Sequence, residues 1–331
     1  MTLINKKDKI FIAGVKGMVG SAIKRKLIQC GYQNLITPDR SELDLTNSDL
    51  VFNWYEKAKP EIVILAAAKV GGIHANKTFP ADFLLDNIKI QTNVIESAWK
   101  NNVKRLLFLG SSCIYPKDTV QPMKEEQLLG SSLETTNECY AIAKICGIKL
   151  CQSLREQYDF DAISLMPTNL YGQGDNYHLL NSHVLPALLH RFHISALENK
   201  KYIECWGTGK PKREFMHVDD LADACIFALE YWNPNNSNSP KKIDGKPLTW
   251  LNVGTGKDIS IKELAKMIAS ITSFKGEINW NSDKPDGTFQ KLLDSSKLQS
   301  LGWYSKINLK DGLKITYESY KKDLRKKNLR I

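Results

Sequence analysis

Short apolar runs rich in Ile, Leu and Val alternate with amphipathic stretches through the first two-thirds of the chain, and this alternation constrains the fold most strongly. The runs predict strands at residues 9–13, 34–37, 61–66, 105–110 and 161–166, the last four as interior strands. After the first run, Val19, Ala22 and Leu27 share one face of a predicted helix. Strands that alternate with helices predict an α/β fold with a doubly wound parallel sheet.

The pattern changes after Met166, where Pro and Gly become frequent and long strands are absent. Helical periodicity returns at residues 217–231 and 261–271, separated by a polar stretch at 233–246 that is typical of an exposed loop. With a length of 331 residues, this change predicts two domains. We expect the first at residues 1–170 with a later contribution from about 213–253, and a smaller C-terminal α/β domain at 171–212 and 254–331.

Two longer helices are predicted at residues 81–101 and 137–158, and both are apolar on more than one face. One face of each helix is needed to cover the sheet, so the other suits a second surface such as a partner subunit. We therefore expect a homodimer.

Composition and charge exclude several classes of protein. Hydrophobic residues make up 42% of the chain and charged residues 25%, which excludes a disordered or collagen-like chain. No apolar run approaches the roughly 18 residues of a membrane helix and no signal-peptide core precedes the first strand, so we expect a cytoplasmic protein with no membrane partner. Half of the net charge of +10 lies in residues 321–330, interpreted as a solvated basic tail. No nucleic-acid motif accompanies this charge, so an anionic small molecule is the favoured partner and nucleic acid is not.

The cysteines and histidines predict neither a disulfide framework nor a metal site. The seven cysteines are scattered and contain no Cys-x-x-Cys pair, so reduced thiols are expected. His190 and His193 lie three residues apart, but no third ligand follows, and we interpret them as part of a solvated helix face.

The pattern Gly-x-x-Gly-x-x-Gly at residues 14–20 follows the first predicted strand and opens the first predicted helix. Glycines permit a tight turn and let backbone N–H groups approach a pyrophosphate, while the positive end of the helix faces that anion. Strand, turn and helix together predict a Rossmann-like domain that binds a dinucleotide.

Residues at the end of the second strand distinguish NAD from NADP. Asp39 suits a ribose 2′-hydroxyl, whereas Arg40 suits a 2′-phosphate, which Lys16 in the glycine turn can also reach. Two cations outweigh one anion, so NADP (NADPH) is the favoured cofactor of the first domain. Asp44 and Leu45 are candidates for the adenine edge, and Asp44 has the alternative of capping a helix.

Tyr140 and Lys144 are four residues apart, which places a phenol and an ammonium on one helical face. A phenol with a pKa of about 10 is a poor acid–base catalyst at neutral pH, and a nearby ammonium lowers that pKa. Ser111 follows the predicted strand that ends at Gly110, where its hydroxyl can polarise a carbonyl beside the phenol. Together with the glycine turn, these residues predict acid–base chemistry at a carbonyl next to the dinucleotide.

With these motifs the chain resembles the extended short-chain dehydrogenase/reductases, which combine a glycine turn, Ser and Tyr-x-x-x-Lys with a C-terminal nucleotide-sugar lobe. Longer segments resemble the GDP-L-fucose synthase family, whose members are 3,5-epimerases and 4-reductases. These segments cover nearly the whole chain and lie at residues 66–73, 110–116, 166–172, 181–184, 213–220, 252–256, 284–288 and 301–303.

The resemblance implies the NADPH-dependent conversion of GDP-4-dehydro-6-deoxy-D-mannose to GDP-L-fucose. It implies that Ser111 steadies the C4 carbonyl oxygen, that Tyr140 protonates it, and that Lys144 supports the phenol and holds the nicotinamide ribose. Cys113 and His183 resemble the pair that inverts C3 and C5, whose protons the ketone acidifies. Nearby cations and the nicotinamide ring are expected to lower the pKa of the Cys113 thiol. From the residues alone, we interpret Cys113 as a small buried hydrophobe and His183 as a capping or core histidine.

The resemblance also implies two sets of binding residues. Expected cofactor contacts are Gly14, Lys16, Gly17, Met18, Val19, Gly20, Arg40, Asp44, Leu45, Leu109, Gly110, Ser111, Tyr140, Lys144, Pro167, Asn169, Leu170 and His183. Expected substrate contacts are Arg191, Trp206, Arg213 and Asp286, with the cations on the GDP pyrophosphate and Asp286 on a sugar hydroxyl. The alternatives are core packing for Trp206, surface pairing for the arginines and a turn for Asp286.

Two other functions remain as alternatives. One is another NAD(P)-dependent nucleotide-sugar 4-epimerase or dehydratase, although a dehydratase needs an acidic pair beside Ser111, where Ser112 and Cys113 stand. The other is a sensor that binds NADPH only as a ligand, which has no need of Tyr140 and Lys144.

Overall fold

A six-stranded parallel sheet forms the centre of the protein in the computed structural model, which describes residues 2–178, 181–284 and 286–331. Its strands lie in the order β2-β1-β3-β4-β5-β9, and each neighbouring pair is parallel. Their bounds are β1 (Ile10–Ala13), β2 (Leu35–Ile36), β3 (Ile62–Leu65), β4 (Arg105–Leu109), β5 (Ala162–Pro167) and β9 (Trp250–Val253). The expected α/β class with a Rossmann-like doubly wound parallel sheet is confirmed.

The prediction of an interior strand at residues 34–37 is wrong, because β2 lies at the edge of the sheet. Leu35 and Ile36 are half-buried, whereas every residue of β3, β4 and β5 is buried. A pair of apolar residues is too short a pattern to distinguish the two positions.

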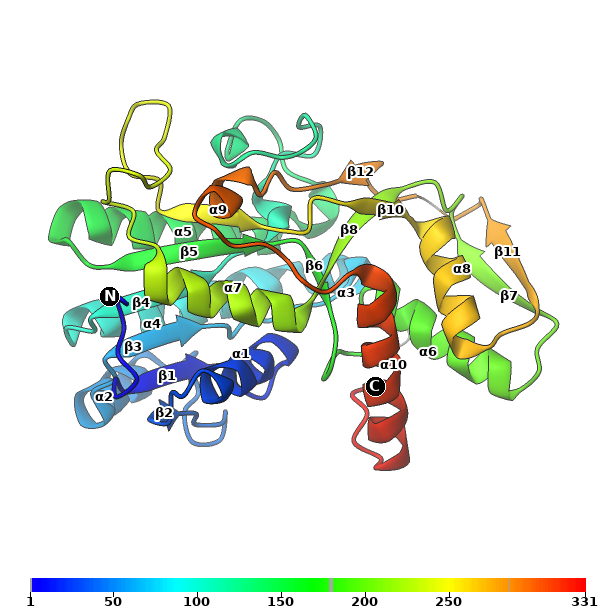
Figure 1. Cartoon of the computed structure of the whole chain (residues 1–331), viewed down its shortest axis with the longest axis horizontal. Helices are drawn as coiled ribbons and strands as arrows, with labels where there is room; N and C mark the ends of the chain where they lie inside the picture. The colour runs from blue at the N-terminus through cyan, green and yellow to red at the C-terminus, as the bar shows by residue number, and fades with distance from the viewer. Residues whose placement is uncertain (1, 179–180, 285) are drawn as a thin grey trace.

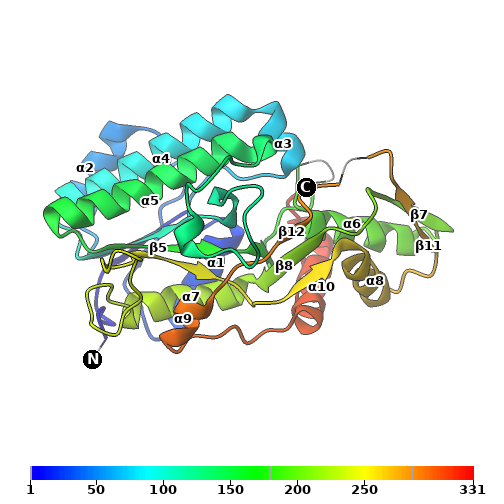
Figure 2. The ribbon, with the colours of Figure 1, turned by 90° about the horizontal axis from the view of Figure 1, so that it is seen from above.

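Helices cover both faces of the sheet (Figure 1). Seen from above, α2, α4 and α5 lie on one face and α1 and α7 on the other (Figure 2). The helices of this half are α1 (Met18–Gln29), α2 (Ser48–Ala58), α3 (Ile73–Thr78), α4 (Pro80–Lys100), α5 (Glu138–Tyr158) and α7 (Val218–Tyr231), with three 3₁₀ turns at Ser112–Ile114, Glu125–Gln127 and Thr135–Asn137. No helix among the described residues is both long and apolar enough to cross a membrane.

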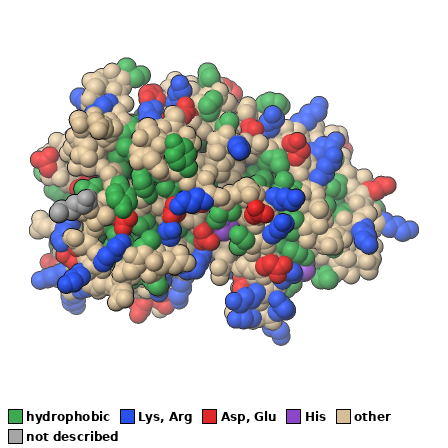
Figure 3. Space-filling model, in the orientation of Figure 1, with side chains coloured by type: hydrophobic (Ala, Val, Ile, Leu, Met, Phe, Trp, Pro, Cys, Tyr) green, Lys and Arg blue, Asp and Glu red, His purple; other side chains and the backbone are tan. Residues whose placement is uncertain are grey.

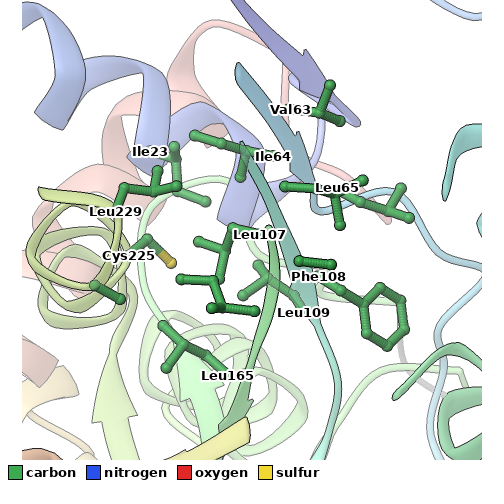
Figure 4. Packing of buried hydrophobic residues seen from close by; sticks show 14 of the residues in the cluster. Ile23, Val63, Ile64, Leu65, Leu107, Phe108, Leu109, Leu165, Cys225 and Leu229 are labelled. Carbon is green, nitrogen blue, oxygen red and sulfur yellow. The ribbon is translucent and has the colours of Figure 1, made fainter. Parts of the chain in front are cut away.

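The main core lies between the sheet and these helices. Ile23 of α1 and Cys225 and Leu229 of α7 are directed toward Ile64 and Leu107 of the sheet (Figure 4), and all five side chains are buried. Because helices cover both faces, the interior strands are continuous apolar runs rather than alternating ones.

A smaller second half is built from short strands and a few helices. In one sheet β8 pairs with β10, β12 and β6, and in another β7 pairs with β11. The bounds are β6 (Asn169–Tyr171), β7 (Tyr202–Trp206), β8 (Lys212–His217), β10 (Asp258–Ser260), β11 (Glu277–Asn281), β12 (Gln290–Lys291), α6 (Val184–Leu197), α8 (Ile261–Thr272), α9 (Ser296–Ser300) and α10 (Leu309–Arg325).

The two halves have separate cores that the chain enters more than once. The second core includes Leu189 of α6, Leu264 of α8 and Leu313 of α10. Residues from β9 and, further along, Leu298 and Trp303 pack in the first core. The chain therefore returns to the first half after residue 254, and the predicted domain boundaries stay a prediction.

The interpretation of residues 321–330 as a tail is wrong for the backbone, which forms part of a helix and pairs with another segment, whereas most of the basic side chains are exposed as expected. Residues 321–325 form the last turn of α10, whose Tyr320 is fully buried. Beyond the helix, the backbone N–H of Tyr177 donates to the carbonyl of Arg330 at 2.7 Å. Lys and Arg side chains do gather over the lower end of α10 (Figure 3), but they belong to a packed helix whose apolar stripe is too sparse to stand out in the sequence.

The interpretation of His190 and His193 as part of a solvated helix face is also wrong, because both side chains contact tyrosines of α10. Nδ1 of His190 lies 2.8 Å from the hydroxyl of Tyr320, and Nδ1 of His193 lies 2.9 Å from the hydroxyl of Tyr317. His193 is buried, because α10 covers this face of α6.

Candidate active site

A cavity of about 650 Å³ lies at the carboxyl ends of β1 and β3, where the strand order changes direction. Ligands of open α/β sheets bind at such a point. All residues predicted to bind the cofactor line it, namely Gly14, Lys16, Gly17, Met18, Val19, Gly20, Arg40, Asp44, Leu45, Leu109, Gly110, Ser111, Tyr140, Lys144, Pro167, Asn169, Leu170 and His183. The structure brings these residues together, and their role in binding stays a prediction.

Two close approaches shape the glycine turn. Gly14 has a φ of 93°, and a Cβ there would lie 2.7 Å from the backbone nitrogen of Ala67. A Cβ on Gly20 would lie 2.2 Å from the carbonyl oxygen of Gly14, so only glycine lets α1 pack against the turn. As a result Gly17 and Met18, where α1 begins, line the cavity. Unpaired N–H groups and the helix dipole make this end attractive to an anion.

Lys16 and Asp39 form an ion pair at the cavity wall, with 2.8 Å between Nζ and Oδ2. The other oxygen of Asp39 accepts from the backbone N–H of Ser41 at 2.8 Å. The hydrogen bond from Lys16, with help from Ser41, holds the pKa of the Asp39 carboxyl well below its usual range. Asp39 is therefore a fixed anion beside the two cations, Lys16 and Arg40, that were predicted to select NADP.

Asp44 does not cap a helix. It accepts hydrogen bonds from the backbone and hydroxyl of Thr46, at 3.0 and 2.8 Å, while Asn47 caps α2. Of the two alternatives, only the position at the cavity wall remains.

Ser111, Tyr140 and Lys144 meet at the inner wall of the cavity. Ser111 follows β4, and α5 carries the other two residues. Nζ of Lys144 donates to the carbonyl of Leu109 at 2.9 Å and lies 5.8 Å from the centre of the Tyr140 ring. The predicted helical face thus holds a buried ammonium between the end of β4 and the phenol.

Burial sets the ionisation of this group. It raises the pKa of Tyr140, the charge of Cys113 adds to the rise, and a hydrogen bond with Ser111 opposes it. Burial also lowers the pKa of Lys144 to about 8. The expected lowering of the phenol pKa by Lys144 is therefore not found, because desolvation is the largest influence on Tyr140 and raises its pKa. Tyr140 stays a neutral phenol that can donate a proton.

Cys113 is buried beside Ser111, whose hydroxyl accepts from the Cys113 backbone N–H at 3.4 Å. Burial raises the pKa of the thiol, and Ser111 and the charges of Lys291 and Lys144 oppose this rise. The expectation of a lowered thiol pKa is wrong for the substrate-free protein, although the expected cations are present.

His183 is the N-cap residue of α6 and is exposed to the cavity that it lines, and its side chain makes no capping hydrogen bond. Desolvation by the surrounding wall lowers the pKa of its imidazole. The preceding segment is held close by Gly72, whose N–H donates to Asn181 at 2.8 Å, and a Cβ on Gly72 would lie 2.5 Å from the carbonyl of Ser182. The absence of a side chain at Gly72 therefore lets the segment before His183 pack closely against this turn.

Lys291 is a residue that sequence reasoning missed. It lies in β12, opposite Arg213 of β8, and burial lowers the pKa of its ammonium. Its charge acts on the Cys113 thiol. A strand of two residues leaves no recognisable pattern in the sequence. The position of Lys291 near the thiol therefore becomes apparent only from the pairing of β12 with β8.

The buried carboxylate of Glu214 positions this strand pair. One of its oxygens accepts from the backbone N–H groups of Thr255 and Gly256, at 2.6 and 2.8 Å, and the other accepts from Leu293 at 3.0 Å. Glu214 therefore ties the segments after β9 and β12 to β8, which carries Arg213.

The predicted substrate residues fall into two groups. Arg191 and Trp206 line a second hollow of about 700 Å³ together with Lys200, Lys201 and Tyr202. Trp206 is 58% exposed, so the core-packing alternative is wrong.

Arg213 and Asp286 line neither hollow. They lie near enough for the Asp286 charge to raise the pKa of Arg213, although burial lowers that pKa more strongly. Asp286 accepts hydrogen bonds from the backbone and hydroxyl of Thr208, at 2.9 and 2.7 Å. These bonds fix the loop that follows Trp206, so Asp286 links the two groups.

Among the described residues, no group of three or more His, Cys, Asp or Glu side chains is arranged to hold a metal ion.

A glycine turn at the switch point of a doubly wound sheet, with Tyr and Lys beside it, is typical of dinucleotide-dependent enzymes that act on carbonyl groups. The model of the NAD dependent epimerase/dehydratase family matches residues 10–242, and the chain belongs to this family. It is 55% identical over 318 residues to a putative GDP-L-fucose synthase of Arabidopsis thaliana, covering 96% of this chain and 93% of the relative. It is 51% identical over 316 residues to the GDP-L-fucose synthase of Escherichia coli, covering 94% and 96%.

A solved structure is similar along nearly the whole chain. The GDP-mannoheptose C4 reductase of Campylobacter jejuni, crystallised with NADP bound, has a TM-score of 0.85 and 41% identity, covering 96% of this chain and 99% of that one.

Lys144→Met should remove a pH dependence of stability that the buried lysine creates. Folding lowers the pKa of Lys144 from 10.5 to about 8, so the unfolded chain binds more protons between these values and stability rises with pH there. In urea unfolding, the parent should gain about 1.5 kcal/mol relative to the variant between pH 8 and 9.5. Lys149→Met, an exposed control on the same helix, should show a constant difference, and a constant difference for Lys144→Met would contradict the assigned burial.

Proposed function

We propose that this chain converts GDP-4-dehydro-6-deoxy-D-mannose to GDP-L-fucose with NADPH, by 3,5-epimerisation followed by reduction of the 4-ketone. The observation that carries the proposal is the group of proton-handling residues at the inner end of the cavity, where Ser111, Tyr140, Lys144 and His183 line the wall and Cys113 is buried beside Ser111 without lining it. The relatives named above, which cover nearly the whole chain, support this choice among carbonyl chemistries.

The cavity suits NADPH, because its glycine turn leaves no room for a Cβ at residue 20 and its rim carries two cations. We assign the turn at residues 14–20 to the pyrophosphate, Lys16 and Arg40 to the 2′-phosphate, and Lys144 to the nicotinamide ribose. When bound, NADPH supplies the hydride for the C4 carbonyl. The similar reductase solved with NADP supports this cofactor.

In the reduction, Ser111 holds the C4 oxygen and Tyr140 gives it a proton. The raised pKa of Tyr140 suits this role, because the phenol enters the reaction protonated. Lys144 then stabilises the phenolate that remains, at a distance of 5.8 Å from the ring centre in the substrate-free protein.

In the epimerisation, Cys113 removes a proton from C3 or C5 to form an enolate, and His183 returns one on the opposite face. The thiol must first ionise, and Lys291 and Lys144 are the charges that favour its thiolate. His183 must gain a proton before it can act as the acid, since its lowered pKa favours the neutral ring.

We place the GDP moiety in the second half of the molecule. Arg191 and Trp206 line its hollow beside two further lysines, which suits an aromatic base and an anionic diphosphate. This assignment divides the chain as the sequence predicts, with the dinucleotide on residues 1–170 and 213–253 and the nucleotide sugar mainly on 171–212 and 254–331. A cytoplasmic location is part of the same proposal.

The alternative is another NAD(P)-dependent nucleotide-sugar 4-epimerase or dehydratase. Incubation of the protein with the 4-keto GDP-sugar separates these functions: stoichiometric loss of NADPH absorbance supports the proposed reductase, whereas turnover without NADPH consumption overturns it.

Tyr140→Phe and Cys113→Ser should each abolish one half-reaction. In deuterated water, Tyr140→Phe should slow NADPH oxidation by about a thousandfold while deuterium still enters C3 and C5. Cys113→Ser should slow deuterium entry by at least about a hundredfold, because a serine hydroxyl is a far weaker base than a thiolate. Mass spectrometry of the recovered sugar measures both effects. Cys30→Ser, at the C-terminal end of α1, is the control, and normal exchange in Cys113→Ser excludes the thiol as the base.

Arg40→Ala should weaken NADPH more than NADH. Loss of a charge-assisted contact to the 2′-phosphate should raise the dissociation constant for NADPH about tenfold, or about 1.4 kcal/mol, and leave NADH nearly unchanged. Asp39→Asn should do the opposite for NADPH, because it removes an anion and releases Lys16 from its 2.8 Å ion pair. Fluorescence titration measures both, and equal effects on the two cofactors contradict the assignment.

We also propose a homodimer formed through α4 and α5. These helices pack together, and Leu85 on α4 and Ile142 on α5 are 52% and 39% exposed. Sedimentation at micromolar concentration should give twice the mass of the chain, and Leu85→Glu with Ile142→Glu should give a monomer, because the charges are placed in an apolar interface. Leu197→Glu, at the exposed end of α6 in the second half, is the control, and a monomeric parent overturns the proposal.

A further inference from the structure

The segment that follows α10 returns to the cofactor cavity. After α10 the chain reverses, with Lys327 in the left-handed region at a φ of 56°, and runs back beside the helix (Figure 1). Arg330 forms a bridge with Asn176, and its carbonyl accepts the Tyr177 N–H at 2.7 Å. Arg330 itself lines the cavity. Arg330 is the last cation of residues 321–330, the segment interpreted from the sequence as a solvated tail.

Contacts of Gly174 place Arg330 beside the first turn of α1. Nη1 of Arg330 donates to the carbonyl of Gly174 at 3.2 Å. A Cβ on Gly174 would lie 3.8 Å from Cα of Met18 and 3.9 Å from the hydroxyl of Ser21. Since α1 begins at Met18, the guanidinium and the positive end of the helix share one wall of the cavity. This bond engages one of the five N–H donors of the guanidinium.

Asp175 is a second, independent sign that this wall binds a polar ligand. It is 6% exposed and lines the cavity. Its Oδ1 accepts from the N–H of Asn176 at 2.7 Å, whereas its Oδ2 is buried with no hydrogen-bond partner. Burial raises the pKa of this carboxyl to about 7, and the charge of Arg330 opposes the rise. Without Arg330, this acid would face an approaching anion with no neighbouring cation to offset it.

We propose that Arg330 binds the diphosphate of the dinucleotide beside the N-terminus of α1. The inference rests on the proposed cofactor and adds a contact outside the glycine turn. The guanidinium offers paired donors to phosphate oxygens, complements the N-terminus of α1 and offsets the charge of Asp175. The chain thereby closes the diphosphate site with a residue more than 300 positions away from the turn.

Three ligands separate a diphosphate contact from a structural role. NADP⁺ and 2′-phospho-ADP-ribose contain the diphosphate, whereas adenosine 2′-monophosphate lacks it. Titration calorimetry should show that Arg330→Ala weakens the first two about tenfold and equally, and changes the third less than twofold. Arg330→Lys should recover part of the affinity by keeping the charge. Arg325→Ala, an exposed control that does not line the cavity, should match the parent for all three.

Other outcomes overturn the inference. Parental affinity for NADP⁺ in Arg330→Ala excludes the contact. An equal loss for adenosine 2′-monophosphate shows that Arg330 only holds the wall in place. Thermal unfolding without ligand identifies a variant that fails to fold, in which case Arg330→Lys and Arg330→Gln carry the comparison. If the parent itself does not bind NADP⁺, the proposed cofactor fails, and that result is separate from an effect of Arg330.

Discussion

The close approach of α1 to the turn after β1 is the contact on which the site depends. Gly20 meets the carbonyl of Gly14, and Gly14 meets the backbone of Ala67, at distances that leave no room for a Cβ. These contacts hold the first turn of a helix and the ends of two strands around one crevice. Interiors are close-packed, so a side chain at either glycine would displace α1 as a unit and move Lys16 and Met18 with it.

Desolvation dominates the chemistry of the inner wall. It favours the neutral forms of Tyr140 and Cys113 and weakens the charge of Lys144. A group that is neutral at rest can give or take a proton without first losing a strong counterion. Each ion that forms during the reaction therefore needs an opposite charge nearby. For the Cys113 thiolate, these are the charges of Lys144 and Lys291.

The sequence predicts the features that local patterns determine. Strands β1, β3, β4 and β5 and helices α1, α4, α5, α7 and α8 follow from periodicity, and the cavity lining follows from motifs at strand ends. The errors concern contacts between distant segments. The edge position of β2, the packing of α10 on α6, and the placement of Lys291 all depend on which elements pair, which periodicity within one segment does not show. The predicted directions of the pKa shifts of Tyr140 and Cys113 are also wrong, because spacing in the sequence shows which charges are near but not how far water is excluded.

The cations near the candidate site come from distant parts of the sequence. Lys16 and Arg40 come from the first third of the chain, whereas Arg213, Lys291 and Arg330 arrive on β8, on β12 and after α10. In the proposed reaction a dinucleotide and a nucleotide diphosphate sugar each bring a diphosphate, one to each of the two hollows, and these groups repel each other. Cations from both halves would reduce that repulsion, while Asp39 pairs with Lys16 and Glu214 holds the strand that carries Arg213 in position. The late segments are therefore part of the electrostatics of the site, and the two halves must pack correctly before either ligand finds its full set of cations.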